Sequence, residues 1–263
     1  MTAIRLGAVA YLNAAPLVYG LERQSDRFAL RFDVPATCAS LLHDRQIDVG
    51  LIPSIEYLRR PDYLIVPDIA IASHGPVASV ALFSSGPIDR IKSIALDTSS
   101  RTSAALLKIL CQYRFRITPE FVPHRPDLDA MTYGYGAALL IGDPALDSPY
   151  AALGLRKIDL GEEWTNMTGL PFVYAAWTGR TGAVTDEEVH LLQKAQEEGT
   201  RAASTIAAEY GRGDADATAR ASAYLRDNVK YGLGPEEARG LQMFLDYASE
   251  LGLASRRRTL EFF

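Results

Sequence analysis

"IRLGAVAYLNAAPLVYGL" (residues 4–21) opens the chain with a strand signal followed by a turn and the start of a helix. Its first nine residues are mainly apolar and rich in small side chains, which is typical of a buried strand in a parallel sheet. Asn13 and Pro16 then interrupt the apolar run, and proline fits the first turn of a helix because its missing N–H is not needed there. The stretch therefore predicts a strand and a helix joined at one edge of a sheet.

The same alternation continues along the next part of the chain. Residues 30–35 predict a second strand and residues 47–53 a third. Between them, residues 37–46 have the apolar spacing of a short helix, with Thr37 as its predicted cap. Strands that alternate with helices indicate an α/β unit with a parallel sheet.

The pattern restarts after an apolar strand at residues 77–84. The following segments predict a strand at residues 93–97, a helix at 99–113, a strand at 118–124, and then a helix or loop and a strand that ends within 133–143. Residues 169–177 predict another continuous apolar strand. The helix at 99–113 has the clearest signals, with Ser99 or Ser100 as its cap and an apolar stripe along one face. This region predicts a second α/β unit.

After Trp177 the sequence becomes helical in composition and period. Three amphipathic helices are predicted there, at residues 185–211, 215–234 and 234–253. Thr185 and Glu188 form a capping box at the start of the first of them. Residues 258–263 are the one further segment that could add a short strand.

Two α/β units and a helical tail predict an α/β fold of two lobes, with mainly parallel sheets flanked by helices. The predicted first lobe combines residues 1–80 with 178–263, and residues 81–177 form the second. The strands at 77–84 and 169–177 are placed to cross between the lobes. The helical tail is expected to cover the first lobe rather than to form a dimer surface. A small ligand is expected in the cleft between the lobes, at the carboxyl ends of the strands.

The composition limits the class of partner and the location. Of the 263 residues, 48% are hydrophobic and 22% are charged, which is typical of a globular protein with a substantial core. The net charge of −5 provides no basic field for nucleic acid or an acidic membrane. No apolar run approaches the roughly 18–20 residues of a membrane span. The N-terminus has no signal-peptide pattern, so we expect a cytoplasmic protein.

Cysteines and histidines form no recognisable metal or redox motif. Cys38 and Cys111 are expected to be free thiols, with a disulfide as the alternative. The four histidines, at positions 43, 74, 124 and 190, are scattered, so no metal site is expected. The sequence also contains no glycine-rich nucleotide motif and no arrangement typical of a Ser-His-Asp hydrolase.

Three loops are expected to line the cleft, and the first contains Asn13. Its amide offers a donor and an acceptor at a helix start, so Asn13 is either a ligand contact or a helix N-cap. The second loop gathers Arg101 and four hydroxyls at one helix N-terminus, namely those of Ser99, Ser100, Thr102 and Ser103. A cap needs one hydroxyl, so the surplus favours binding of a carboxylate or phosphate.

The third loop places Gly142 and Asp143 at the end of a predicted strand. Asp143 either caps the next turn, orients a hydroxyl or acts as a base. His74 and Ser79 lie near the predicted crossover between the lobes. Together the loops predict a site for a small organic anion, and they provide no obvious nucleophile.

Six segments occur in order within residues 8–177, and they read AYLNAAPLVYGL, DVGLIPSIEYL, GPVASVALFS, DTSSRTSAALLKILC, IGDPAL and DLGEEWTNMTGLPFVYAAW. These segments resemble the chorismate dehydratase family, which acts in the futalosine route of menaquinone biosynthesis. The resemblance implies a fold like that of the type 2 periplasmic binding proteins, in agreement with the two predicted lobes. It also implies chorismate as the small-molecule substrate and no cofactor.

The activity that the resemblance implies is the dehydration of chorismate to 3-[(1-carboxyvinyl)oxy]benzoate. The ring proton beside the ether is removed and the neighbouring hydroxyl leaves. Because the ring becomes aromatic, the reaction has a large driving force and needs neither a strong base nor a cofactor. Such a site needs two places that hold carboxylates, a dry pocket and fixed geometry.

The motifs also imply roles for single residues. Asn13 is expected to orient the substrate, and Ser79 to hydrogen-bond a carboxylate or the leaving hydroxyl. The S-R-T loop at 100–102 is expected to hold the second carboxylate. The proton acceptor is either the enolpyruvyl carboxylate of the substrate or Asp143. The implied substrate-binding residues are Ser54, Ser99, Ser100, Arg101, Thr102, Gly142 and Asp143.

Three other functions compete with the dehydratase. The chief alternative is a non-catalytic binding protein for a small aromatic or dicarboxylic acid, because transport receptors share the fold. The others are the sister enzyme that acts later in the same pathway and a ligand-sensing domain of a regulator. The expected histidine-containing motif of the sister enzyme is replaced here by AVAYLNAAP. No nucleic acid or membrane partner is expected, and the protein is either a monomer or a homodimer.

Overall fold

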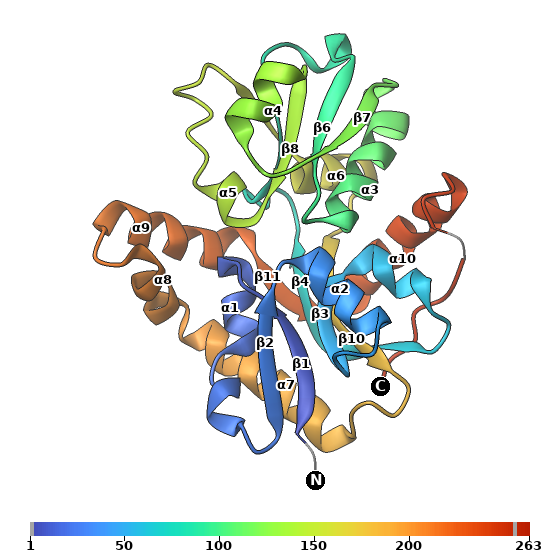
Figure 1. Ribbon diagram of the computed structural model, residues 1–263, viewed down its shortest axis with the longest axis vertical. Helices are drawn as coiled ribbons and strands as arrows, with labels where there is room; N and C mark the ends of the chain where they lie inside the picture. Colours follow the sequence, from blue (N-terminus) through green and yellow to red (C-terminus); the bar gives the residue numbers. More distant parts are fainter. Residues whose placement is uncertain (1–2, 255–256) are drawn as a thin grey trace.

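The computed structural model describes residues 3–254 and 257–263, and its strands form two sheets (Figure 1). The six-stranded sheet has the order β11 (Lys230–Leu233), β4 (Tyr63–Ser73), β10 (Phe172–Arg180), β3 (Val49–Pro53), β1 (Ile4–Val9) and β2 (Phe28–Asp33). The five-stranded sheet has the order β7 (Glu120–His124), β6 (Ser93–Asp97), β8 (Ala137–Ile141), β5 (Val80–Ser84) and β9 (Arg156–Asp159). The predicted α/β fold is confirmed.

Both sheets are mixed, so the prediction of mainly parallel sheets is wrong. In the first sheet β1 runs parallel to β2 and β3, whereas β10 runs antiparallel to β3 and β4. In the second sheet β6 runs parallel to β7 and β8, whereas β5 runs antiparallel to β8 and β9. The reason is the route of the chain between the sheets. The chain enters the second sheet at β5 and returns to the first sheet at β10, and each of these strands runs opposite to its neighbours.

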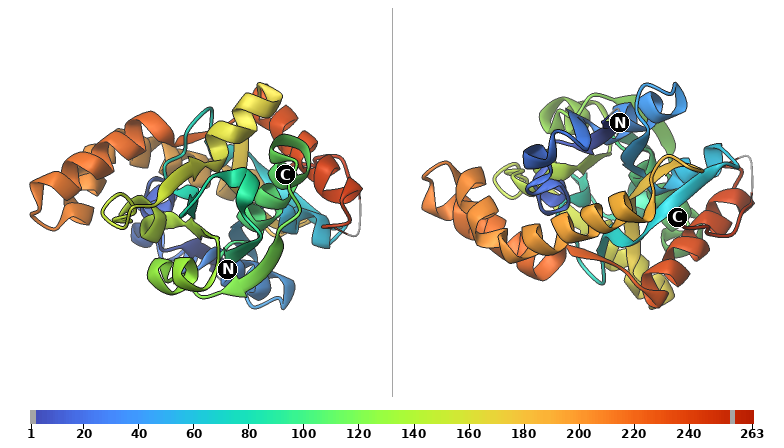
Figure 2. Two further views of the ribbon diagram at one scale, coloured as in Figure 1. Left: turned by 90° about the horizontal axis from the view of Figure 1, so that it is seen from above. Right: turned by 90° about the horizontal axis from the view of Figure 1, so that it is seen from below.

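Helices surround both sheets (Figure 1). The α-helices are α1 (Ala15–Val18), α2 (Pro35–His43), α3 (Arg101–Leu110), α4 (Leu128–Gly134), α5 (Gly142–Leu146), α6 (Leu160–Thr168), α7 (Asp186–Arg201), α8 (Ala203–Gly211), α9 (Ala215–Ala223) and α10 (Pro235–Glu250). Shorter 3-10 helices are η1 (Leu12–Ala14), η2 (Leu21–Gln24), η3 (Ser54–Arg59) and η4 (Ile88–Arg90), and η5 (Cys111–Phe115) and η6 (Tyr224–Asn228) are π-turns. Figure 2 shows α8 and α9 extending to one side of the molecule and α10 lying on the opposite side.

Two short segments connect the sheets. The chain leaves the first sheet after β4 and enters the second at β5, and it returns between α6 and β10. The crossing segments are therefore residues 74–79 and 169–171, rather than whole strands at 77–84 and 169–177. We propose two lobes, each built around one sheet. The predicted first lobe combined residues 1–80 with 178–263, and the predicted second lobe was 81–177. Because β10 pairs with β3 and β4 of the first sheet, we move the second boundary between the lobes to residue 171.

An aromatic cluster fixes the return segment. The rings of Trp164 in α6, Phe172 in β10 and Phe244 in α10 pack edge to face. The ring centroid of Phe172 lies 5.2 Å from that of Trp164 and 4.9 Å from that of Phe244. The Trp164 indole N–H donates to the carbonyl of Pro171 at 3.1 Å. These contacts join an element of the second lobe to two elements of the first at the crossing itself.

Helix starts were predicted with mixed success. Ser100 caps α3, since its hydroxyl accepts from the Ser103 amide, and the capping box of Thr185 and Glu188 is present at α7. The predicted cap at Thr37 is wrong, because α2 already begins at Pro35, whose fixed φ angle suits the first helical position.

The C-terminal region differs most from its prediction. The predicted helix at 185–211 divides at Ala202 into α7 and α8. The predicted helix at 215–234 ends in the π-turn η6, and β11 follows it along the edge of β4. Within β11 buried and exposed residues alternate, a strand pattern too short to be distinguished from a helix in the sequence. The expected strand at 258–263 is reduced to one bridge between Phe262 and Ile65.

Cys38 and Cys111 are both buried and free, as expected. Within residues 3–254 and 257–263, no helix is long and apolar enough to cross a membrane.

Candidate functional site

A cavity lies between the two sheets and is lined by both of them. It has about 430 Å³ of empty volume, counted together with its opening to solvent. Its walls are mostly apolar, and polar side chains are confined to a few positions. The lining residues are Val9, Tyr11, Asn13, Pro35, Pro53, Ile71, Val80, Ser100, Ser103, Ile141, Gly142, Tyr174 and Ala175. A mostly apolar pocket with a few placed polar groups is the usual form of a small-molecule site.

Asn13 reaches the cavity from the turn after β1. It lies inside η1, and neither η1 nor α1 has a side-chain cap, so Asn13 is not the N-cap that was one of its two predicted roles. Its Oδ1 atom is buried, with no hydrogen-bond partner among the described residues. A buried acceptor without a partner costs free energy. Asn13 therefore offers an unused acceptor to a ligand in the cavity.

Ser79 stands directly before Val80, which lines the cavity. The Ser79 hydroxyl lies 2.7 Å from the hydroxyl of Tyr224 in η6, and both side chains are buried. Burial raises the pKa of Tyr224, while hydrogen bonds from Ser79 and Asn13 act in the opposite direction. The structure thus pairs Ser79 with Tyr224, a residue that the sequence did not identify as part of the site.

The position of Ser79 is fixed by Asp159, the cap of α6. The Asp159 carboxylate accepts hydrogen bonds from the amides of Val77 at 3.1 Å and Ala78 at 2.6 Å. Ala78 adopts a left-handed backbone angle of φ 66°, which is uncommon for a residue with a side chain. The carboxylate of Asp159 thus holds the first crossing segment in an unusual turn that presents Ser79 to Tyr224.

The N-terminus of α3 reaches the cavity through Ser100 and Ser103. The Ser100 hydroxyl accepts from the Ser103 amide at 3.2 Å and donates to the Ser103 hydroxyl at 2.9 Å. Ser99 donates its amide and its hydroxyl to one oxygen of Asp97, at 2.8 and 2.6 Å. Burial raises the pKa of Asp97. The first amides of a helix have no partner within the helix, so this end of α3 can accept an anion.

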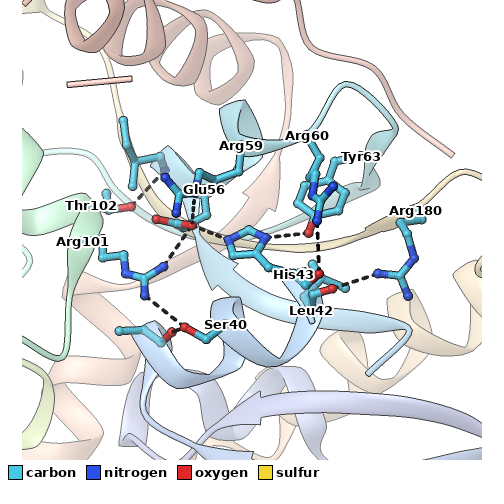
Figure 3. A network of polar contacts seen from close by, with 12 residues as sticks. Ser40, Leu42, His43, Glu56, Arg59, Arg60, Tyr63, Arg101, Thr102 and Arg180 are labelled. Atoms are coloured by element: carbon cyan, nitrogen blue, oxygen red, sulfur yellow. Dashed lines mark hydrogen bonds and ion pairs between the residues drawn. The ribbon is translucent and has the colours of Figure 1, made fainter. Parts of the chain in front are cut away.

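Arg101 is held by groups of the first lobe instead of lining the cavity. Its guanidinium lies 3.1 Å from Glu56 and donates to the Ser40 hydroxyl at 3.0 Å (Figure 3). Glu56 also contacts His43, whose other ring nitrogen lies 2.7 Å from the Tyr63 hydroxyl. Burial acts to raise the pKa of Glu56, but the His43 hydrogen bond and the Arg101 charge outweigh it, so the pKa is lowered. Arg101 therefore ties α3 to α2 and η3.

Two more predicted site residues are bonded within the protein. The Thr102 hydroxyl accepts from the Ile55 amide at 3.1 Å (Thr102 is drawn in Figure 3), and Ser54 donates to the carbonyl of Val173 at 2.7 Å. Both side chains are buried. They join α3 and β10 to the segment that follows β3.

Gly142 and Asp143 meet the first lobe at Tyr11 and Leu12. Gly142 has φ 62°, and a Cβ atom there would lie 2.7 Å from the Tyr11 ring. Asp143 accepts from the Leu12 amide at 3.0 Å and does not cap α5, whose N-cap is Ile141. Burial raises the pKa of Asp143 to about 6. Asp143 lines a neighbouring groove beside Tyr210 and Arg212 rather than the cavity.

The predicted residues thus fall into three groups. Asn13, Ser100 and Gly142 line the cavity, and Ser79 directly precedes Val80, which also lines it. The others, namely Ser54, Ser99, Arg101, Thr102 and Asp143, have their side chains bonded to protein groups. Sequence reasoning missed Tyr11, Tyr174 and Tyr224. In the described part of the chain, no three His, Cys, Asp or Glu residues gather closely enough to hold a metal ion.

Solved structures with the same fold include binding proteins. AF1704 from Archaeoglobus fulgidus superposes with a TM-score of 0.76 at 20% identity, over 95% of this chain and 98% of that one. The periplasmic aliphatic sulphonate binding protein SsuA from Escherichia coli has a TM-score of 0.64 at 16% identity, over 98% of this chain and 95% of that one. At these identities the likeness concerns the fold, and it confirms the predicted periplasmic-binding-protein architecture.

Sequence comparison gives the family. A chorismate dehydratase from Thermus thermophilus is 33% identical over 212 residues, which cover 74% of this chain and 76% of that protein. A chorismate dehydratase from Campylobacter jejuni is 29% identical over 178 residues, 65% of this chain and 66% of that protein. The family model described as menaquinone biosynthesis matches residues 4–250. The two chorismate dehydratases are thus relatives of this chain. The chain belongs to the menaquinone biosynthesis family.

Proposed function

We propose that this protein is a carbon–oxygen lyase that dehydrates chorismate to 3-[(1-carboxyvinyl)oxy]benzoate, the first step of the futalosine route to menaquinone. The relatives are named for this reaction, and the family is described by this pathway. The observation that carries the proposal is the buried, unused oxygen of Asn13 at the edge of an apolar cavity. Such an acceptor matches a ligand that is largely a ring and carries a hydroxyl.

The dehydration needs the protein mainly to hold the substrate in a fixed position. One ring proton leaves beside the ether, the neighbouring hydroxyl departs as water with that proton, and the ring becomes aromatic. The described residues that line the cavity include no Asp, Glu, His or Lys. We therefore assign the proton to the enolpyruvyl carboxylate of the substrate itself, which lies close to the reacting carbon. Asp143, which faces the neighbouring groove, is the alternative base.

The cavity provides different partners for the two ends of chorismate. The amides at the start of α3, with Ser100 and Ser103, would hold one carboxylate. Asn13 would accept a hydrogen bond from the ring hydroxyl, and Ser79 would donate to a substrate oxygen. Gly142 would lie against the ligand. Ser54, Ser99, Arg101 and Thr102 would support the site through their bonds to the protein.

The setting of the enzyme follows from the same reasoning. We propose a cytoplasmic protein, as expected for a biosynthetic enzyme, with a small molecule as its partner. Its net charge of −5 disfavours binding to nucleic acid or to an acidic membrane. We propose a monomer or a homodimer.

Incubation of the purified protein with chorismate tests the function. We expect a product lighter than chorismate by one water, with the ultraviolet absorbance of a substituted benzoate. The Asn13→Ala variant, prepared in the same way, serves as the control for a contaminating enzyme. Tight binding of chorismate with no product would contradict the proposal and would favour the non-catalytic binding protein.

A further inference from the structure

Ala78, in the first crossing segment, has a left-handed backbone angle that its own neighbourhood in the chain does not explain. It is one of five described non-glycine residues with a positive φ angle. Arg45, Arg116 and Arg212 lie at or just past the ends of helices, where chains commonly adopt this conformation. Asp68 belongs to a residue type that tolerates it. For Ala78, with φ 66°, the surrounding structure must stabilise the angle.

Two charged side chains of β9 hold both backbone polar groups of Ala78. The Asp159 carboxylate accepts from the Ala78 amide at 2.6 Å, and the Lys157 ammonium donates to the Ala78 carbonyl at 2.6 Å. Lys157 and Asp159 are two positions apart in β9, so their side chains leave the same face of the strand. The amide and the carbonyl of a residue lie on either side of its two rotatable bonds. Fixing both groups therefore fixes the conformation of Ala78.

The surroundings of Lys157 make the contact with Ala78 its main polar task. Its Nζ atom lies 6.0 Å from the ring centroid of Phe83 and 5.7 Å from that of Tyr150, within the range of cation–π contacts. Burial lowers the pKa of Lys157, while the charge of Asp159 acts in the opposite direction. An ammonium group that is partly removed from water needs a hydrogen-bond acceptor, and the Ala78 carbonyl provides one.

The conformation of Ala78 sets the direction of the next residue, Ser79. The Ser79 hydroxyl contacts that of Tyr224 at 2.7 Å, and the Ser79 carbonyl accepts from the Gly142 amide at 2.8 Å. Gly142 and Val80, which follows Ser79, both line the cavity. A change of φ at Ala78 would turn Ser79 away from these two contacts, and with it the start of the cavity wall at β5.

We propose that Lys157 is a positioning residue, which acts with Asp159 to hold Ala78 in the left-handed conformation that sets Ser79 beside the cavity. The inference rests on the proposed function, in which Ser79 donates to a substrate oxygen. Lys157 is not among the residues that line the cavity. Its effect on the reaction passes through the backbone of Ala78.

The first test is Lys157→Met, which removes the donor and keeps a flexible chain of similar length. We expect kcat to fall about tenfold while KM changes less than about threefold, because no side chain that lines the cavity is altered. Lys108→Met is the matched control, since the Lys108 Nζ atom also lies over an aromatic ring, 5.4 Å from the centroid of Phe121. That control should leave kcat unchanged. A wild-type kcat for Lys157→Met would overturn the proposal.

A glycine at position 78 separates the backbone effect from the simple loss of a charge. Glycine adopts the left-handed conformation without steric cost. Ala78→Gly, added to Lys157→Met, should therefore return kcat to within about threefold of the wild type. A double variant as slow as Lys157→Met would overturn the proposal. If Lys157→Met does not fold, a folded and active double variant would support the proposal, and an unfolded one would overturn it.

The φ angle of residue 78 tests the inference without any turnover. In ligand-free crystal structures, Ala78 should lie outside the left-handed region in Lys157→Met, and the residue at this position should lie inside it in the double variant. A left-handed Ala78 in Lys157→Met, with Ser79 still on Tyr224, would overturn the proposal. If the wild type binds chorismate without forming a product, the proposed function is wrong, and these structures still decide whether Lys157 holds the turn.

Discussion

Two polar regions flank the cavity, and they use their hydrogen bonds in opposite ways. On one side, Ser79 and Tyr224 form a buried hydrogen-bonded pair, and the buried Asn13 oxygen has no partner among the described residues. On the other, the loop 99–102 at the start of α3 bonds its side chains to Asp97, Ser103, Glu56 and Ile55. The first region offers a side chain to the ligand, and the second offers mainly its backbone amides.

The difference shows that the density of polar residues in a sequence does not measure how many of them reach a ligand. The loop 99–102 has more hydroxyl and charged groups than the Asn13 turn, yet each of its side chains is bonded to a protein group, and those of Arg101 and Thr102 join the two lobes. Arg101 is the clearest case, because its charge is neutralised by Glu56 of the first lobe. The variants below test this contrast from its largest expected effect to its smallest.

Replacing Asn13 should have the largest effect on activity. We expect Asn13→Ala to lower kcat by about a hundredfold, since one hydrogen bond aimed at the leaving hydroxyl is lost in a dry site. The free energy of unfolding should fall by less than about 1 kcal/mol, because the oxygen that is removed has no partner. Steady-state kinetics with chorismate and a thermal melt check both points. Activity within twofold of the wild type would place the chemistry elsewhere.

Gly142→Ala should disturb the contact between the lobes. The new Cβ atom would lie 2.7 Å from the Tyr11 ring, at a left-handed backbone angle of φ 62°. We expect the free energy of unfolding to fall by about 3 kcal/mol and activity to fall about tenfold.

Gly154→Ala is the matched control for this effect. Gly154 has a similar angle, φ 69°, and no atom within 4 Å of the new Cβ position. It should cost about 1 kcal/mol through backbone strain alone and leave activity unchanged. Equal denaturant midpoints for the two variants would mean that the Tyr11 contact contributes nothing.

Arg101→Gln distinguishes a structural ion pair from a substrate contact. If Arg101 acts through Glu56, KM should rise less than about fivefold, and the Arg101→Gln and Glu56→Gln losses of stability should be non-additive. Kinetics and denaturant titrations of both single variants and the double variant measure this. A KM that rises a hundredfold in Arg101→Gln and not in Glu56→Gln would mean that Arg101 holds a substrate carboxylate.

Asp143→Asn should have the smallest effect on activity, within about twofold. Its effect on stability should depend on pH. Burial raises the pKa of Asp143 to about 6 in the folded protein, above the value near 4 expected in the unfolded chain. The folded state therefore binds the proton more tightly, and the Asp143 contribution to stability falls as pH rises from about 4 to 6.

The asparagine has no charge to bury and keeps an oxygen for the Leu12 amide. The variant should gain about 1–2 kcal/mol over the wild type at pH 8 and nothing at pH 3.5. Denaturant unfolding at the two pH values measures the gain. A hundredfold loss of kcat would instead identify Asp143 as the base.

Local signals predicted much of the fold. The alternation of strands and helices, a serine cap at Ser99 or Ser100 and the capping box at Thr185 depend on nearby residues, and each was predicted; the structure assigns the cap to Ser100. Strand direction in β5 and β10 depends on how the chain crosses between the sheets, which no local pattern records. The strand β11 was missed because four residues are too few for a periodic signal.

The candidate site was predicted less completely, for a similar reason. Asn13 and Ser100 occur in turns next to strand ends, where a ligand contact can be expected from the sequence. Tyr224 contacts Ser79 across 145 positions of the chain, and no sequence pattern near Tyr224 indicates that it belongs to the site. The role of Arg101 depended on Glu56, a partner that becomes visible only when the lobes are assembled.

The most direct test is a crystal structure of the Ser79→Ala variant with chorismate bound. Our account predicts that the ligand lies in the cavity between the lobes, with one carboxylate on the first turn of α3 beside Ser100 and Ser103. The ring hydroxyl should donate to Oδ1 of Asn13, and Arg101 should remain on Glu56. Chorismate in the groove beside Asp143 and Tyr210, or a carboxylate bound by Arg101, would contradict the account.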